Sequence, residues 1–165
     1  MDKEKALRKI KENKATKAKE LDLSGLEITE IPKELSDCIW LEKLSLDNTQ
    51  ISEIKGLEQL VNLISLNLFK TKISEIKGLE QQVNLESLDL HGNSISEIKG
   101  LKKLVNLQRL DLSKNPITEI RGLEQLEKLQ TLVFSDTKIS RLKGLGHLKN
   151  LNILFLFGAQ ITEID

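Results

Sequence analysis

The sequence predicts an α/β solenoid in which one parallel sheet, built from one short strand per repeat, is closed on its other side by turns. Three observations predict this fold class. A Leu-x-Leu pair recurs along the chain, the apolar residues between two pairs keep fixed positions, and a glycine marks the same place in five successive repeats. One copy cannot bury such a set of side chains, whereas stacked copies bury it against one another.

Seven copies of the leucine pair are in register over nearly the whole chain. They follow one another at intervals of 22 residues, except that the first interval is 23 residues. The pairs are Leu21/Leu23, Leu44/Leu46, Leu66/Leu68, Leu88/Leu90, Leu110/Leu112, Leu132/Phe134 and Leu154/Leu156. With Leu41 as position 1 of its copy, the pair occupies positions 4 and 6, which face one side of a strand. We therefore expect a parallel sheet of about seven short strands.

The second half of each copy predicts the return path of the solenoid. Apolar residues stand at positions 11, 14 and 17 and usually at position 20, a spacing of three that suits 3₁₀-like turns or short helices on the convex side. Position 16 is the recurring glycine. Rows of Glu at position 13 and of Lys or Arg at position 15 predict a solvated outer surface, although Arg141 interrupts the acidic row.

The start of the chain predicts a helix that covers the first repeat. Ala6, Leu7 and Ile10 fall on one helical face among charged residues, and a solenoid needs its exposed ends capped. We divide the chain into an N-terminal capping helix and linker, residues 1–17, and a repeat domain, residues 18–165, whose last repeat is incomplete. The C-terminal end carries no comparable cap, so we expect either a longer protein or a homodimer through that end.

The repeat pattern resembles the leucine-rich repeat of the 22-residue class, which bacterial internalins and a phosphatase-regulating eukaryotic family use. The resemblance covers residues 18–165 and implies a right-handed solenoid that binds proteins. Position 9 of this family usually carries an Asn that bonds to neighbouring turns, and Asn93 and Asn115 stand there. The other copies have Thr, Leu or Ala, so we expect a regular ladder in the middle and looser turns at both ends.

The first repeat also resembles the opening of the leucine-rich segment in bacterial Roco-type GTPases. The residues that carry this resemblance are Leu21-Asp-Leu-Ser-Gly and Ile31-Pro-Lys-Glu-Leu. It implies a regulatory repeat segment of a larger signalling protein. The chain itself contains no GxxxxGK[ST] phosphate loop.

The candidate binding surface is the concave face, which we define as the side chains at positions 3, 5 and 7 of the strands. These side chains point away from the core and are mostly polar in the first five strands. In the last two strands the face becomes apolar, although solvent-facing positions of a strand should be polar, and such clusters usually mark an interface. The proposed contact residues are Phe69, His91, Asp89, Asp111, Val133, Ile153, Phe155 and Phe157.

Phe155 and Phe157 are the expected anchors of this surface, because aromatic side chains typically dominate interface energetics. Phe69 and His91 form a lesser second contact. Only one of the four phenylalanines, Phe134, falls on a core position. The alternative is that Phe155 and Phe157 pack under C-terminal residues outside this chain or in a homodimer.

Composition excludes several other functions. The chain has 25 Lys plus Arg and 25 Asp plus Glu, and this neutral balance argues against binding of nucleic acid. The longest apolar stretch, Ile153 to Ala159, is too short to span a membrane. Cys38 has no partner for a disulfide and no signal-peptide pattern is present, so we expect a cytoplasmic protein.

No set of residues predicts catalysis. Asp89, His91, Asp111 and Ser113 should be neighbours on two strands and could hold a cation or exchange protons, but surface strands carry such polar residues without either role. We therefore predict no catalytic residue, no metal and no cofactor. The expected function is a protein–protein interaction scaffold, with a regulatory segment of a Roco-type GTPase or an internalin-like adhesion module as alternatives.

Overall fold

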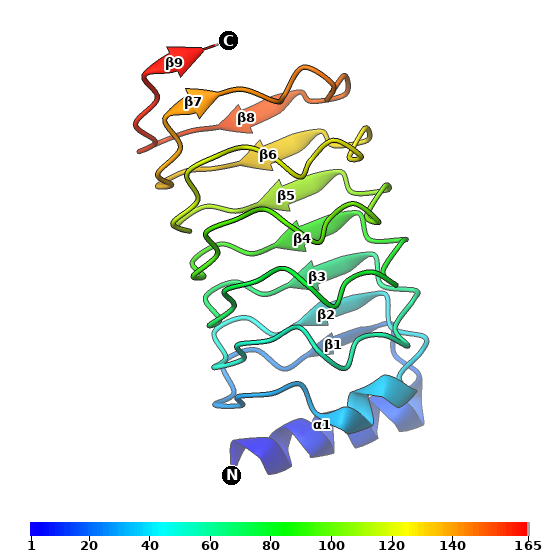
Figure 1. The fold of residues 1–165 in the computed structure, drawn as a ribbon. Helices are drawn as coiled ribbons and strands as arrows, with labels where there is room; N and C mark the ends of the chain where they lie inside the picture. Colours follow the sequence, from blue (N-terminus) through cyan, green and yellow to red (C-terminus); the bar gives the residue numbers. More distant parts are fainter. Residues whose placement is uncertain (165) are drawn as a thin grey trace.

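The computed structural model describes residues 1–164 and shows a solenoid with a helix at its N-terminal end (Figure 1). Helix α1 (Asp2–Thr16) lies across the first repeat, and a sheet of seven parallel strands extends from it. The strands are β1 (Glu20–Asp22), β2 (Lys43–Ser45), β3 (Ser65–Asn67), β4 (Ser87–Asp89), β5 (Arg109–Asp111), β6 (Thr131–Val133) and β8 (Ile153–Phe155). The predicted parallel sheet and capping helix are confirmed.

The register of the sheet follows the repeat directly. The position-4 leucines of neighbouring copies stand side by side, as Leu44 does with Leu66 and Leu66 with Leu88. The first pair, Leu21 with Leu44, keeps the same register although its interval is one residue longer. The leucines of these pairs are buried from β1 to β6, so the core is one continuous stack running the length of the solenoid.

The return paths are closed by 3₁₀-like turns, as predicted, and one of them forms a short helix. Within residues 1–164 there is one 3₁₀ helix, η1 (Lys33–Asp37), in the longer first repeat. The next return is closed instead by two successive turns, in which the Leu60 amide donates to the Leu57 carbonyl at 2.9 Å and the Leu63 amide donates to the Leu60 carbonyl at 3.2 Å. The two turns meet only at Leu60, and a continuous helix would require turns that overlap by more than one residue.

A second, two-stranded sheet on the return side was not predicted. It pairs β7 (Arg141–Leu142) with β9 (Glu163–Ile164), and Figure 1 shows both strands beside β8 at the C-terminal end. The Arg141 Nε atom lies 2.8 Å from the Glu163 Oε2 atom. This ion pair explains why the acidic row changes to Arg141, since the next residue of the row is its partner.

The asparagine ladder in the middle repeats is confirmed. The Asn93 side-chain oxygen accepts the Ile73 amide at 3.0 Å, and its Nδ2 donates to the Leu68 carbonyl at 2.8 Å and the Leu90 carbonyl at 3.0 Å. Asn115 repeats this arrangement one copy later. The threonines at this position donate to the carbonyl three residues earlier, and Thr71 also donates to the Asn93 side-chain oxygen of the next repeat at 2.5 Å.

Helix α1 completes the hydrogen bonding of the first strand as well as covering its core. Ala6 and Ile10 are buried against the first repeat. The Asn13 Nδ2 donates to the Ala18 carbonyl at 3.0 Å and to the Glu20 carbonyl at 3.1 Å, while its Oδ1 accepts the Trp40 indole N–H at 2.9 Å. The N-terminal end of the sheet is therefore closed by polar as well as apolar contacts. No helix among the described residues is long and apolar enough to cross a membrane.

Candidate functional site

The apolar end of the concave face, defined by Val133, Ile153, Phe155 and Phe157, is the most exposed cluster of large apolar side chains on the sheet. Ile153 is 45% exposed, Phe155 51% and Phe157 81%. Val133 is only 8% exposed, because it stands in register with Phe155 on the same face. The structure thus brings the four predicted residues together. Val133 is buried beneath the others, and Ile153, Phe155 and Phe157 form the accessible surface.

The central group of the concave face consists of Phe69, His91, Asp89 and Asp111, which the structure also brings together. The rings of Phe69 and His91 are tilted by 55° with their centroids 4.9 Å apart. Asp89 and Asp111 stand in register on β4 and β5. The Asp89 carboxylate accepts the His91 backbone amide at 2.9 Å, so the turn after β4 fixes its position. Both predicted parts of the face therefore exist, at separate places along it.

The central group is acidic and partly removed from water. Burial raises the pKa of the Asp89 carboxyl above its usual value, and the charge of Asp111 raises it further, while the bond from the His91 amide acts in the opposite direction. The Arg109 guanidinium lies 4.0 Å from an Asp111 oxygen. The hydroxyl oxygen of Ser113 is buried without a partner. In residues 1–164, no three His, Cys, Asp or Glu side chains are grouped to hold a metal ion.

A row of exposed aliphatic side chains on the edge of the solenoid was not predicted from the sequence. It consists of four residues that each stand two positions before the start of the next repeat and are about half exposed: Ile39, Val61, Val83 and Val105. The asparagine after each valine donates to the carbonyl of the row member in the preceding repeat, as Asn84 does to Val61 at 2.9 Å. The recurring Val-Asn-Leu was the available signal. It marks a second ladder that ties one repeat to the next.

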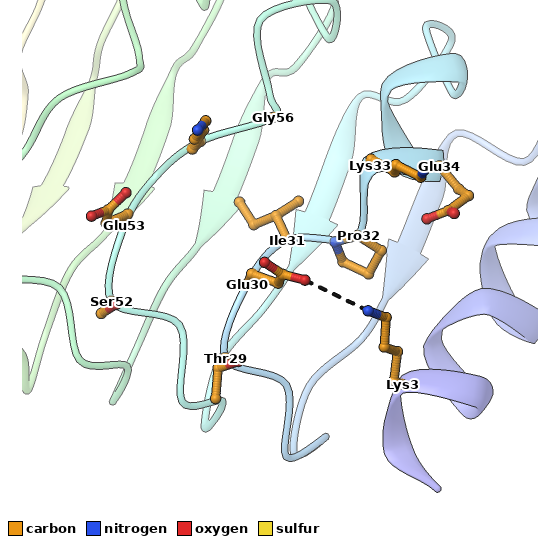
Figure 2. A pocket seen from close by; sticks show the side chains of 11 residues that line it. Lys3, Thr29, Glu30, Ile31, Pro32, Lys33, Glu34, Ser52, Glu53 and Gly56 are labelled. Carbon is orange, nitrogen blue, oxygen red and sulfur yellow. Dashed lines mark ion pairs between the residues drawn. The ribbon is translucent and has the colours of Figure 1, made fainter.

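A pocket lies away from the concave face, between α1 and the first two return paths (Figure 2). Its volume is about 630 Å³, and Lys3 crosses its mouth to pair with Glu30 at 3.6 Å. Lysines and glutamates alternate around it without one dominant charge. A smaller groove of about 390 Å³ occupies the equivalent place between two later repeats, around Glu75 and Glu97. The cavity is thus an enlarged form of a groove that the repeat itself creates.

Comparison with known families decides the class of the protein. The model for "Leucine Rich repeats (2 copies)" matches residues 39–81, 61–103 and 83–125, which together cover more than half of the chain. The chain belongs to the leucine-rich repeat family. This confirms the resemblance drawn from the 22-residue repeat. A comparison with the curated proteins finds no match.

Several solved leucine-rich repeat structures resemble this one along most of its length. Internalin C2 of Listeria monocytogenes is 31% identical over 87% of this chain and 63% of its own, with a TM-score of 0.81. A leucine-rich repeat protein of Leptospira interrogans is 32% identical over 89% of this chain and 39% of its own, also with a TM-score of 0.81.

The functional domain of InlJ from Listeria monocytogenes is 29% identical over 89% of this chain and 32% of its own, with a TM-score of 0.76. This chain therefore spans less than two thirds of the length of each of the three proteins. The internalin part of the predicted resemblance is confirmed. The resemblance to Roco-type GTPases stays a prediction.

Proposed function

We propose that this chain is a protein-recognition scaffold that binds a protein partner through its concave face and performs no catalysis. A leucine-rich repeat fold related to internalins supports the general class of an interaction module. The observation that carries the specific proposal is the exposure of Phe155 and Phe157 on a rigid sheet whose other outward residues are mostly polar. A soluble partner that covers them relieves an unfavourable contact with water.

The size of this anchor is sufficient for a specific contact. A Phe side chain buries about 150–250 Å² and apolar burial stabilises by ~25 cal/mol per Å², so covering the exposed parts of both rings contributes about 6 kcal/mol before the costs of association. Those costs are themselves roughly 4–15 kcal/mol. The two rings therefore supply a large share of a binding free energy but need further contacts.

The central group supplies those further contacts. Phe69 and His91 present a pair of rings, and the carboxylates of Asp89 and Asp111 lie beside them. Because both carboxylates are partly buried, a basic side chain of the partner gains more from meeting them than it gains from a fully exposed acidic residue. We therefore expect a partner segment that combines an apolar contact at β8 with a Lys or Arg near β4 and β5.

Affinity capture from the source cell tests this proposal. We expect the wild-type chain to retain a protein that the Phe155→Asp/Phe157→Asp double variant loses. Val105→Asp is the matched control, because Val105 is 45% exposed but lies on the edge row and not on the concave face. Capture of the same proteins by the wild type and the double variant would contradict the proposal.

An internalin-like adhesion module is the second candidate, and the similarity to two Listeria proteins favours it. We propose a cytoplasmic location, and the single cysteine, Cys38, which is a buried free thiol, is compatible with a reducing compartment. Fractionation of the source cell separates the two: a cytoplasmic pool supports an internal scaffold, and a surface pool supports adhesion. The neutral charge balance supports a protein partner over nucleic acid.

A further inference from the structure

We propose that the central group of the concave face is a receptor for one arginine side chain of the protein partner, whose guanidinium bridges the carboxylates of Asp89 and Asp111. The inference deepens the proposed function and rests on it, because it names the partner residue that meets this part of the face. It follows from the orientation of the two carboxylates, from the charge that they leave unbalanced and from the rings beside them.

The two carboxylates are held in the same orientation by the backbone. The Oδ1 atom of Asp89 accepts the His91 amide at 2.9 Å, and the Oδ1 atom of Asp111 accepts the Ser113 amide at 2.9 Å. Within residues 1–164, neither Oδ2 atom accepts a hydrogen bond. The two aspartates stand in register on β4 and β5, and neighbouring strands lie about 4.8 Å apart. The chain thus presents two fixed acceptors on adjacent strands.

This pair of carboxylates is limited to two strands. At the same position, β3 carries Asn67, whose side chain makes the equivalent bond to the Phe69 amide at 2.9 Å and donates to Asp47 at 3.2 Å. On the other side, β6 carries Val133, which is buried. The acidic site is therefore bounded by an amide that is already bonded and by an apolar side chain.

The charge of the two carboxylates is not balanced within the described part of the chain. Arg109 is 53% exposed, and its guanidinium lies 4.0 Å from an Asp111 oxygen, too far for a hydrogen bond. Asp89 forms no ion pair in residues 1–164, and its burial and the Asp111 charge raise the pKa of its carboxyl. A cation between the two carboxylates relieves their repulsion. It gains more here than at a solvated acid, because the Asp111 side chain is only 13% exposed.

The rings of Phe69 and His91 favour arginine over lysine as this cation. They stand two residues beyond the carboxylate position, with their centroids 4.9 Å apart. The Phe69 ring already attracts one cation of its own chain, since Lys70 Nζ lies 5.1 Å from its centroid. A guanidinium is planar, stacks on aromatic rings and donates to two acceptors at once, whereas an ammonium is a point charge. Paired acceptors beside rings therefore match arginine.

A buried polar group at the same place also lacks a partner. Ser113 is 2% exposed, and its hydroxyl oxygen has no hydrogen-bond partner in residues 1–164. Its backbone amide holds the Asp111 carboxylate, so this hydroxyl stands at the end of the acidic pair. Buried polar groups in native proteins are nearly always paired. The unpaired hydroxyl indicates that the hydrogen bonding of this site is incomplete in the free chain.

Titration of the chain with N-acetyl-arginine amide, followed by amide NMR spectroscopy, tests the site without the partner. The His91 and Ser113 amides report on the two carboxylates directly, because they donate to them. The Ser24 amide is the internal control, since it donates to Asp22 at 2.8 Å but Asp22 has no carboxylate beside it in register. We expect the His91 and Ser113 resonances to shift together with one affinity, while that of Ser24 stays unchanged.

N-acetyl-lysine amide is the matched probe, because it carries the same charge. We expect it to bind about tenfold more weakly, the effect of losing one charged hydrogen bond. Asp89→Asn and Asp111→Asn should each weaken arginine binding by about tenfold or more. Both should fold, because Asn67 makes the same bond to its following turn. Asp22→Asn should leave binding unchanged. Equal affinities for the two probes, a Ser24 shift as large as the others, or no shift at millimolar arginine probe would overturn the proposal.

The result is separable from that of the proposed function. If the Phe155→Asp/Phe157→Asp variant loses a captured protein but the wild-type chain does not bind the arginine probe, the arginine site alone is refuted. If the probe binds as expected but the double variant captures the same proteins as the wild type, the apolar anchor is refuted and the arginine site stands.

Discussion

The glycines at position 16 share a backbone conformation but differ in how much room a Cβ atom would have. Their alanine variants should therefore differ in stability because of steric overlap alone. Gly100 and Gly144 have φ angles of 80° and 85°, a region that side-chain-bearing residues rarely adopt. A Cβ atom on Gly100 would stand 1.8 Å from the Ile76 carbonyl oxygen, whereas on Gly144 the nearest atom, the Ile120 carbonyl oxygen, is 3.1 Å away. The alanine substitutions therefore share a conformational cost and differ in overlap with the preceding repeat.

The magnitude follows from these two contributions. Placing alanine in the left-handed region costs about 1–2 kcal/mol, and both variants lose this much. The obstructing atom beside Gly100 belongs to the backbone and cannot rotate away, so the repeats must separate locally at a further cost of about 1–3 kcal/mol, as in an overpacked core. We expect Gly100→Ala to be destabilised by about 2 kcal/mol more than Gly144→Ala.

Urea unfolding followed by circular dichroism measures this difference. Gly122→Ala provides an intermediate point, because its Cβ would stand 2.3 Å from the Ile98 carbonyl oxygen. We expect destabilisation to decrease in the order Gly100, Gly122, Gly144, with similar m-values showing that the same unit unfolds. Equal losses for the three variants would refute the reasoning, since the φ angle alone would then explain them.

Three further substitutions test other parts of the structure. Gln82→Leu should stabilise the fold by about 1 kcal/mol in urea unfolding, because the buried Gln82 Oε1 has no partner, and an unchanged midpoint would count against this. Asn93→Ala should cost about 3 kcal/mol or more, because buried backbone groups on both sides lose partners, and a loss below 1 kcal/mol would show that the ladder is dispensable. Because burial raises the pKa of Asp89, its ionisation destabilises the fold as pH rises, and Asp89→Asn should be more stable than the wild type at neutral pH but equal to it at about pH 3. Asn67 makes the same bond to the following turn at 2.9 Å in the preceding strand, so a difference that persists at low pH would exclude the charge as its cause.

The sheet could be predicted because the length of the repeat determines the register between neighbouring strands. Each leucine of β2 to β6 stands 22 residues from its neighbour in the next strand. The repeat interval in the sequence therefore identifies which residues are neighbours in the sheet. The concave positions follow from strand alternation in the same way. This is why the exposure of Phe155 and Phe157 could be predicted.

Features that depend on one particular neighbour could not be predicted. Val133 is an outward residue like any other in its row, and it is buried only because Phe155 stands beside it. The cap function of Asn13 requires the carbonyls of the first strand to lie under α1, which no helical periodicity reveals. The β7–β9 pair likewise depends on the ion pair between Arg141 and Glu163, one repeat apart.

Binding of the captured partner to a Phe157→Ser variant tests the central claim most directly. Phe157 is the most exposed anchor, and position 7 already carries serine in other strands, as in Ser113 and Ser135, so the fold should be unaffected. Calorimetric titration should show affinity reduced by roughly 30-fold or more, the effect of a dominant interface residue of ~2 kcal/mol. An unchanged affinity, with a native circular dichroism spectrum, would contradict recognition through the apolar end of the concave face.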